Sequence, residues 1–201
     1  CHTDMYHYQA WKQIADELGI YFDEEINNRL RGVSRRESLD IILENCMEKP
    51  EEAEITRLLE KKNSIYRKLL EQLTPESVEA SVRDTLEWLR REEIPAAVGS
   101  SSKNTEYILE RTDLVRYFDA VADGNMITRS KPDPEVFLKA AELISVNPED
   151  CIVVEDAVAG IRAAKSAGMY AVGIGEAAAY SGTDYGIRDL TELRRLILEW
   201  D

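Results

Sequence analysis

Three short polar segments in the second half of the chain each follow an apolar run and together suit chemistry on a phosphate group. Residues 99–104 (GSSSKN) combine hydroxyls, a cation and a helix start, and this combination binds anionic oxygens through backbone N–H groups and the helix dipole. Lys131, held by the proline that follows it, is a candidate fixed partner for a phosphate. Glu155 and Asp156 end a buried-strand pattern, where two adjacent negative charges require a cation. Mg²⁺ prefers such oxygen ligands.

Each segment also has a simpler interpretation. The serines suit a turn that caps a helix, Lys131 suits a solvated lysine before a helix that begins with proline, and Glu155-Asp156 suits a solvated acidic turn with Asp156 as the N-cap. Three such segments at successive strand ends favour the joint interpretation, which is Mg²⁺-assisted phosphoryl transfer. The sequence has no GxxxxGKS/T motif and no GxGxxG motif after a strand, so nucleotide binding loses support. Its two histidines, His2 and His7, lie in the helical part, which disfavours a Ser-His-Asp site.

The elements that must position these segments alternate between strand and helix after residue 75. Short apolar runs predict strands at residues 94–98, 118–122, 151–154 and 170–174. Amphipathic runs predict helices at residues 78–91, from about 103, and at 133–143, 157–167 and 190–200. Strands that are apolar on both faces indicate a parallel sheet with helices on both sides. We therefore expect an α/β, Rossmann-like core with the polar segments at the carboxyl edge of its sheet.

The chain up to residue 75 carries a helical pattern without a β-rich run. Ser34 followed by Glu37 ahead of an apolar run has capping-box spacing, which predicts that a helix begins at Arg35. Thr74-Pro75 predicts the N-cap and the first residue of a further helix. Antiparallel helices in a small bundle are the simplest arrangement. We expect a helical domain at residues 1–75 and the α/β core at residues 76–201.

The composition disfavours several classes of protein. The 201 residues hold 25 Lys and Arg against 39 Asp and Glu, and the net charge of −14 would repel a nucleic-acid backbone. No apolar run approaches the roughly 20 residues that cross a bilayer. Cys1, Cys46 and Cys151 lack CxxC spacing, which disfavours a disulfide framework or a zinc site. We expect a globular, cytoplasmic, monomeric protein whose partner is a small molecule rather than a nucleic acid or a membrane.

The sequence resembles the haloacid dehalogenase superfamily of phosphotransferases over essentially the whole chain. The core motifs that carry the resemblance are residues 100–104, 117–119, 130–134 and 154–161. Residues 6–12, 32–39 and 62–63 of the helical part are similar to the sugar-phosphate mutases of that superfamily. The resemblance implies a Rossmann-like core with a four-helix cap that opens and closes over the site. It also implies interconversion of β-glucose 1-phosphate and glucose 6-phosphate through β-glucose 1,6-bisphosphate and a phospho-aspartate.

The resemblance further implies roles for individual residues of the core. Ser100 and Lys131 would hold the transferring phosphoryl group, and Glu155 and Asp156 would take part in binding Mg²⁺, the implied cofactor. The other core residues of the implied cleft are Ser102, Lys103 and Asn104.

In the cap, the resemblance implies a sugar-phosphate loop that contains Gly32 and Val33 and that ends at Arg35, which would pair with the distal phosphate. His7 would lie at the hinge side, near the catalytic loop. The other cap residues of the implied cleft are Trp11, Ser38, Lys62 and Asn63. Lysine and arginine from both parts would then make a local basic pocket in an acidic protein, as a doubly phosphorylated sugar requires.

The sequence departs from the family in one motif. The first core strand of the family, and the DxD motif at its end that supplies a nucleophilic Asp and an acid/base Asp, are not in this sequence, and we expect both upstream of Cys1. Two other functions stay open: a sugar-phosphate phosphatase of the same superfamily, and a catalytically inactive sugar-phosphate-binding protein if the native chain begins at Cys1. A dehalogenase is disfavoured because a small haloacid has no phosphate group for these Arg and Lys side chains to bind.

Overall fold

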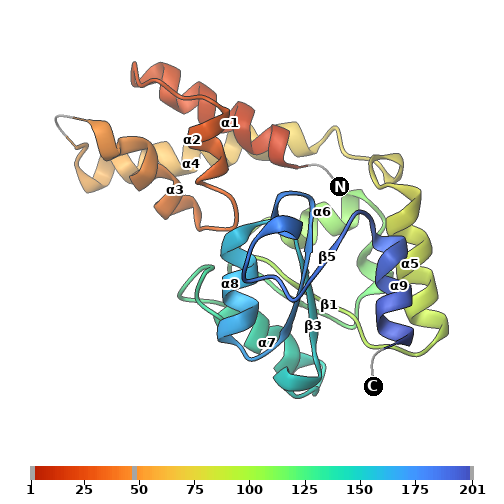
Figure 1. Ribbon diagram of the computed structural model, residues 1–201. Helices are drawn as coiled ribbons and strands as arrows, with labels where there is room; N and C mark the ends of the chain where they lie inside the picture. Colours follow the sequence, from red (N-terminus) through yellow and green to blue (C-terminus); the bar gives the residue numbers. More distant parts are fainter. Residues whose placement is uncertain (1–2, 47–48, 200–201) are drawn as a thin grey trace.

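Helices make up the first part of the chain and an α/β arrangement makes up the second (Figure 1). The computed structural model describes residues 3–46 and 49–199, so Cys1, His2 and the predicted helix end at residue 200 lie outside the described residues. The helices of the first part are α1 (Asp4–Glu17), α2 (Glu24–Asn28), α3 (Arg35–Ile42) and α4 (Glu52–Leu70), with a short 3-10 helix at Leu43–Asn45. The α1 and α4 helices pack along each other.

The predicted start of α3 is confirmed. Ser34 has extended backbone, its hydroxyl accepts a hydrogen bond from Glu37 N–H, and the Glu37 carboxylate accepts one from Ser34 N–H. This reciprocal pair satisfies two donors that the helix itself leaves without acceptors. Apolar side chains then bury the inner face of the helical part, where Trp11, Leu39 and Leu58 are 2% exposed or less.

The elements of the second part follow the predicted order with shorter strands. The helices are α5 (Ala80–Arg91), α6 (Thr105–Arg111), α7 (Glu135–Leu143), α8 (Val158–Ser166) and α9 (Leu190–Leu198). The strands are β1 (Ala97–Gly99), β2 (Ala120–Ala122), β3 (Ile152–Glu155), β4 (Tyr170–Ile174) and β5 (Tyr185–Ile187). Short 3-10 helices lie at Pro75–Ser77, Val115–Tyr117, Pro148–Asp150 and Gly175–Ala179. Thr74-Pro75 therefore starts a 3-10 turn and not the α-helix that the sequence predicts.

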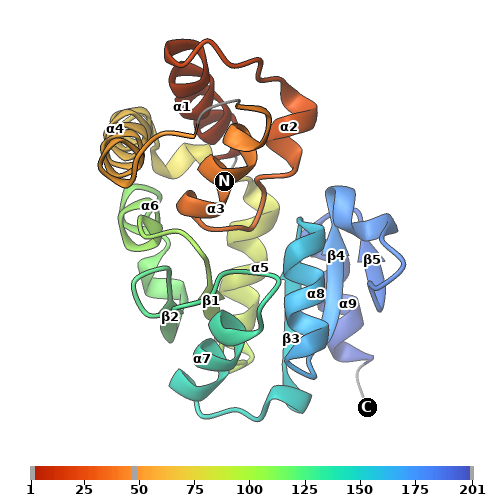
Figure 2. The ribbon, with the colours of Figure 1, turned by 90° about the vertical axis from the view of Figure 1, so that its left-hand side faces the viewer.

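The strands are all parallel, as predicted, and they lie in two groups. One sheet has the order β1-β2 and the other the order β3-β4-β5, and Figure 2 shows the two groups side by side. At the carboxyl ends of β1 and β3, the Lys131 ammonium contacts both the Gly99 carbonyl and the Glu155 carboxylate. The Lys131 side chain therefore links the ends of these two strands.

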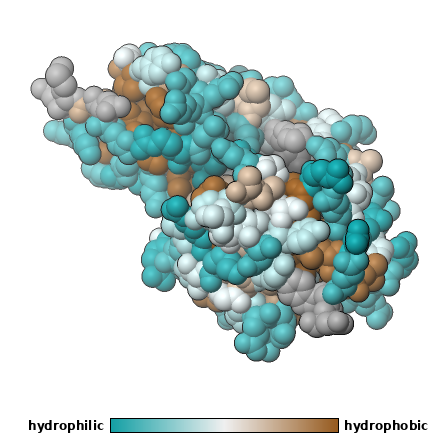
Figure 3. Space-filling view, viewed as in Figure 1, coloured by the Kyte–Doolittle hydropathy of each residue, from teal (hydrophilic) through white to brown (hydrophobic). Residues whose placement is uncertain are grey.

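Helices cover both faces of the strands, as the apolar runs predict. Figure 1 shows α7 and α8 on one side and α5 and α9 on the other. Val153 packs with the α7–α8 cluster, whereas its neighbours Ile152 and Val154 pack with the cluster that includes Leu193 of α9. Alternate residues of β3 thus face opposite layers, which is the period of an extended strand. The face drawn in Figure 3 is mostly hydrophilic. Among the described helices, none is long and apolar enough to cross a membrane.

The helical part depends on its own apolar core for stability. Leu58 on α4 is fully buried in the core of the helical part. We expect Leu58→Ala to lower the free energy of unfolding by about 2–5 kcal/mol, because the substitution removes buried methyl groups and leaves a cavity. Leu198→Ala on α9 is the matched control, since that leucine is 73% exposed. Urea denaturation followed by circular dichroism measures both, and equal losses in the two variants would contradict the assigned core.

Candidate active site

A cavity of about 530 Å³ lies between the helical part and the carboxyl ends of β1 and β3. It is lined by every residue that the sequence analysis assigned to the cleft except Asn63. The lining residues assigned in advance are His7, Trp11, Gly32, Val33, Arg35, Ser38, Lys62, Ser100, Ser102, Lys103, Asn104, Lys131, Glu155 and Asp156. Residues that are far apart in the sequence thus meet at one edge of the strands, where open parallel sheets bind ligands.

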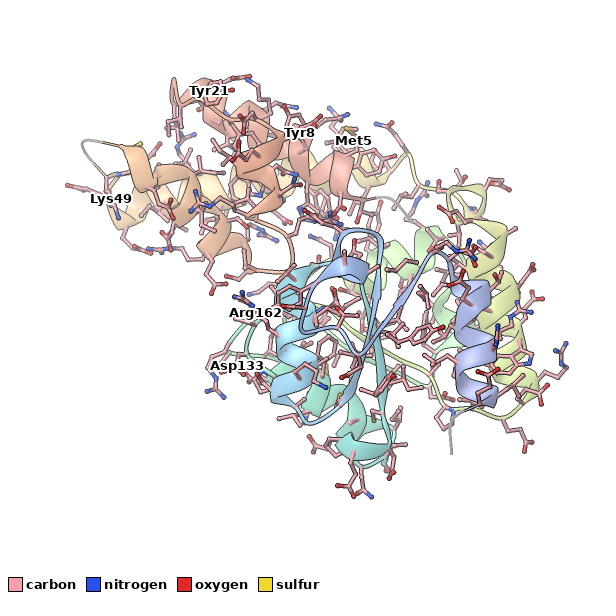
Figure 4. The ribbon with its side chains drawn as sticks, in the orientation of Figure 1. Met5, Tyr8, Tyr21, Lys49, Asp133 and Arg162 are labelled. Carbon is pink, nitrogen blue, oxygen red and sulfur yellow. The ribbon has the colours of Figure 1, made fainter. Side chains whose placement is uncertain are left out.

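The floor of the cavity is a buried ion pair between Lys131 and Glu155. Their side chains are 7% and 9% exposed, and the Lys131 ammonium also donates to the Gly99 carbonyl at 3.1 Å. The ammonium lies 4.6 Å from the ring centroid of Phe137 on α7. Two residues further along the chain, Asp133 (Figure 4) accepts a hydrogen bond from Glu135 N–H at 3.0 Å and so fixes the start of α7. These contacts hold a positive charge at the strand ends.

The serine-rich loop after β1 uses its hydroxyls in two ways. Ser100 Oγ accepts from Ser102 N–H at 3.1 Å, and Ser102 Oγ accepts from Asn104 N–H at 3.2 Å. Accepting these bonds leaves each hydroxyl proton to donate to another oxygen, which an anion in the cavity would supply. The simple turn and the anion site are therefore compatible. The α6 helix begins at Thr105, two residues later than predicted, because these serines hold the preceding loop in a turn.

Arg35 projects from the first turn of α3 on the opposite side of the cavity. Its guanidinium donates to Asn63 Oδ1 at 2.8 Å, and Asn104 of the second part donates to the same oxygen at 2.9 Å. Asn63 therefore does not line the cavity but orients two residues that do. Burial lowers the pKa of Arg35 from its ordinary value.

A cluster of Lys62, His7, Trp11 and Tyr66 closes the helical side of the cavity. Lys62 is 2% exposed, and its ammonium lies 2.8 Å from His7 Nδ1 and 4.4 Å from the ring centroid of Tyr66. The His7 and Tyr66 rings stack at 4.0 Å. Burial lowers the pKa of Lys62 and of His7, and the neighbouring cations add to both shifts. Burial also raises the pKa of Tyr66 to about 12.

Arg31, which the sequence analysis did not single out, neutralises the second carboxylate of the predicted acidic pair. Its guanidinium forms ion pairs with Asp156, with Asp4 at 2.9 Å and with Glu176 at 3.3 Å. The requirement of a cation for each of the adjacent carboxylates is thus met by Lys131 at Glu155 and by Arg31 at Asp156. Within residues 3–46 and 49–199, no group of three His, Cys, Asp or Glu side chains is placed to hold a metal ion.

The remaining assigned residues shape the wall. Gly32 has a φ of +80°, in the left-handed region that favours glycine, and a Cβ there would lie 3.4 Å from the Ala159 side chain. This turn brings Val33 and the start of α3 to the cavity. The Ser38 hydroxyl donates a hydrogen bond to the Ser34 carbonyl at 2.9 Å. Lys103 lines the cavity on the serine-rich loop.

Comparisons with known proteins agree with this geometry. The model of the haloacid dehalogenase-like hydrolases matches residues 1–174. The chain therefore belongs to the haloacid dehalogenase-like hydrolase family, as the motifs predict.

Within that family, the chain is similar to β-phosphoglucomutases. It is 41% identical to the β-phosphoglucomutase of Bacillus subtilis, over 99% of this chain and 90% of the relative. The crystal structure of the Clostridium difficile β-phosphoglucomutase superposes with a TM-score of 0.91 at 35% identity, over 98% of this chain and 89% of the other. A phosphorylated carbohydrates phosphatase of Thermotoga maritima is 33% identical over 83% of this chain and 76% of its own length.

The close packing of α8 against Glu155 generates a prediction for the ion pair. A Cβ on Gly160 would lie 2.1 Å from the carboxyl carbon of Glu155, so Gly160→Ala forces the carboxylate away from Lys131. We expect a loss of about 1–3 kcal/mol in the free energy of unfolding, as for other overpacked sites. Ser166→Ala, at the exposed end of the same helix, is the control. Thermal and urea unfolding measure both, and identical stability of the two variants would exclude the close approach.

Proposed function

We propose that this protein is a β-phosphoglucomutase, which interconverts β-glucose 1-phosphate and glucose 6-phosphate through β-glucose 1,6-bisphosphate, and that residues 1–75 are its cap domain. The observation that carries the proposal is that one cavity has a cation at each end, Lys131 on the α/β side and Arg35 on the helical side. A bisphosphate needs both ends neutralised, whereas a phosphatase needs only the end where phosphate leaves. The similarity to β-phosphoglucomutases along nearly the whole chain supports the same conclusion.

In this proposal the two ends of the cavity bind different phosphate groups. Lys131 and Ser100 hold the phosphoryl group that is transferred, through preorganised charge and a hydroxyl donor. Arg35, held by Asn63, pairs with the distal phosphate while the sugar turns over. The helical part covers the cavity and excludes water, which favours transfer to a sugar hydroxyl over hydrolysis. The family resemblance implies that an aspartate outside this sequence carries the phosphoryl group.

Mg²⁺ is the cofactor that we propose, with Asp156 as a ligand. The Asp156 carboxylate lies on the cavity wall with its side chain 56% exposed, and it offers the hard oxygen donors that Mg²⁺ prefers. Glu155 lies next to it, and both carboxylates have a cationic partner, Lys131 at Glu155 and Arg31 at Asp156. The Lys131–Glu155 pair is the more deeply buried of the two, so a bound ion would compete with Arg31 for Asp156. The bound ion would supply positive charge to the phosphoryl oxygens.

A mutase assay on the protein as its gene encodes it tests the proposal. Glucose 6-phosphate and inorganic phosphate are both measured after addition of β-glucose 1-phosphate, with Mg²⁺ and with EDTA. We expect Mg²⁺-dependent isomerisation that exceeds phosphate release. Release of phosphate at the same rate as loss of substrate would make the protein a phosphatase and would overturn the proposal.

Arg35→Ala tests the site for the distal phosphate. Since loss of a hydrogen bond to a charged group costs about 1.5–3 kcal/mol, we expect kcat/KM for isomerisation to fall by roughly 10- to 100-fold. The matched control is Arg57→Ala, because this arginine pairs with Glu54 and Glu17 on the surface and does not line the cavity. Equal kinetics in the two variants would remove Arg35 from the site.

Binding of the sugar phosphate is expected to take up protons. The pKa of Lys62 lies well below its ordinary value in the cavity, and a phosphate dianion nearby favours the protonated form, so its pKa rises on binding. At a pH above the second pKa of a phosphate ester, which is about 6, the ligand is already a dianion, so a rise in the pKa of Lys62 is measured as proton uptake by the protein. Calorimetry of glucose 6-phosphate binding in buffers of different ionisation enthalpy measures this uptake.

The control for proton uptake is the pair Lys62→Met and Lys61→Met. Lys61 is exposed and pairs with Glu17, so its variant should retain the uptake that the Lys62 variant loses. A binding enthalpy of the unsubstituted protein that is independent of the buffer would contradict the prediction.

A further inference from the structure

A hydrogen-bond network joins the start of α3 in the helical part to the loop before α7 in the α/β part. Ser34 N–H donates to the Glu37 carboxylate at 2.8 Å and to Ser130 Oγ at 3.2 Å. The Ser130 hydroxyl in turn donates to the same oxygen of Glu37. The capping box of α3 is therefore completed by a third residue, 93 positions away from Glu37 in the sequence.

The place of this network in the chain links it to both ends of the cavity. Ser34 directly precedes Arg35, and Ser130 directly precedes Lys131. One hydrogen bond between Ser34 and Ser130 therefore connects the two segments that carry the cations. Because the planar peptide link fixes the distance between consecutive Cα atoms, the position of each serine constrains the Cα atom of the cationic residue next to it. Asn63 and Glu155 then hold the charged ends of those two side chains.

The charge of Glu37 makes the network stronger than a contact between neutral groups. Burial opposes ionisation of this carboxyl, but the hydrogen bonds from Ser130 and Ser34 outweigh it and lower its pKa. Hydrogen bonds to an ionised carboxylate are roughly twice as strong as neutral ones. On the other side of the loop, Lys131 is held by Glu155 and Gly99, so the loop is tied to the core at one residue and to α3 at the next.

We propose that Ser130 is a positioning residue, which with Ser34 and Glu37 forms a latch that sets the separation of Arg35 and Lys131 when the two parts are closed. The latch makes the cavity selective for phosphorylated molecules long enough to reach both cations, such as a hexose phosphate on a phosphorylated enzyme. The choice of substrate rests on the proposed mutase function, whereas the latch itself rests only on the contacts.

Three variants test the latch. Ser130→Ala removes the shared hydroxyl and leaves the capping box of α3 intact. Ser130→Thr retains a hydroxyl, and Asp40→Asn breaks a surface pair with Arg36 on the same helix without touching the α/β part. The measurements are kcat/KM for isomerisation of β-glucose 1-phosphate, the rate of hydrolysis of acetyl phosphate, and amide hydrogen exchange of residues 32–38 in the presence of inorganic phosphate.

We expect Ser130→Ala to lower kcat/KM for isomerisation about tenfold, because the two cations lose their fixed separation. Hydrolysis of acetyl phosphate, which is too short to reach both cations, should change less than twofold. Exchange of residues 32–38 should accelerate several-fold. Ser130→Thr and Asp40→Asn should match the unsubstituted protein in all three measurements.

Two results overturn the latch: unchanged hydrogen exchange in Ser130→Ala, or an equal loss with acetyl phosphate and with β-glucose 1-phosphate. The second result would mean that Ser130 acts only on Lys131. Failure of the proposed function has a different signature, since the unsubstituted protein would then show no isomerisation. The exchange experiment would still decide whether the latch exists.

Discussion

The buried pair of Lys131 and Glu155 is the interaction on which the arrangement of the site depends. Two ionised groups as deeply buried as these are stable only when each has a partner, and here the partner of each comes from a different sheet or loop. Lys131 reaches the end of β1 through the Gly99 carbonyl and the end of β3 through Glu155. The absence of a side chain on Gly160 makes room for the carboxylate. The cavity floor and the position of the loop before α7 therefore have one electrostatic origin.

The same principle organises the side of the cavity that the helical part supplies. Arg31 forms ion pairs with carboxylates of α1, of the residue after β3 and of the 3-10 helix at Gly175–Ala179. Asn63 accepts from Arg35 of its own part and from Asn104 of the other. Polar groups of each part thus form hydrogen bonds and ion pairs with the other part, and these contacts stabilise the closed arrangement. Apolar packing stabilises each part separately, with Leu58 in one core and Val153 in another.

Local signals in the sequence predict most of the elements and the three polar segments of the α/β part, whereas the residues of the helical part that line the cavity were implied by the family resemblance. Ser34 and Glu37 are three residues apart, so the start of α3 could be read from their spacing. The apolar run of β4 has the bounds Tyr170–Ile174 that the sequence predicts. By contrast, Tyr185–Ile187 is a three-residue strand with two exposed positions, too short to give a periodic signal. The contacts of Arg31 depend on residues far apart in the chain, and no spacing rule reports such contacts.

Two lysines of the cavity, Lys62 and Lys131, are buried inside a protein of net charge −14. The net negative charge of the protein therefore repels a phosphorylated sugar at long range, and Lys62 and Lys131 attract it only at short range. The screening length is about 8 Å at physiological ionic strength and about 30 Å at 0.01 M salt, so added salt shortens the range of the repulsion more than it weakens the buried contacts. Capture of the anion is thus governed by shape and close contact, and long-range steering, which accelerates association in oppositely charged pairs, works against this protein.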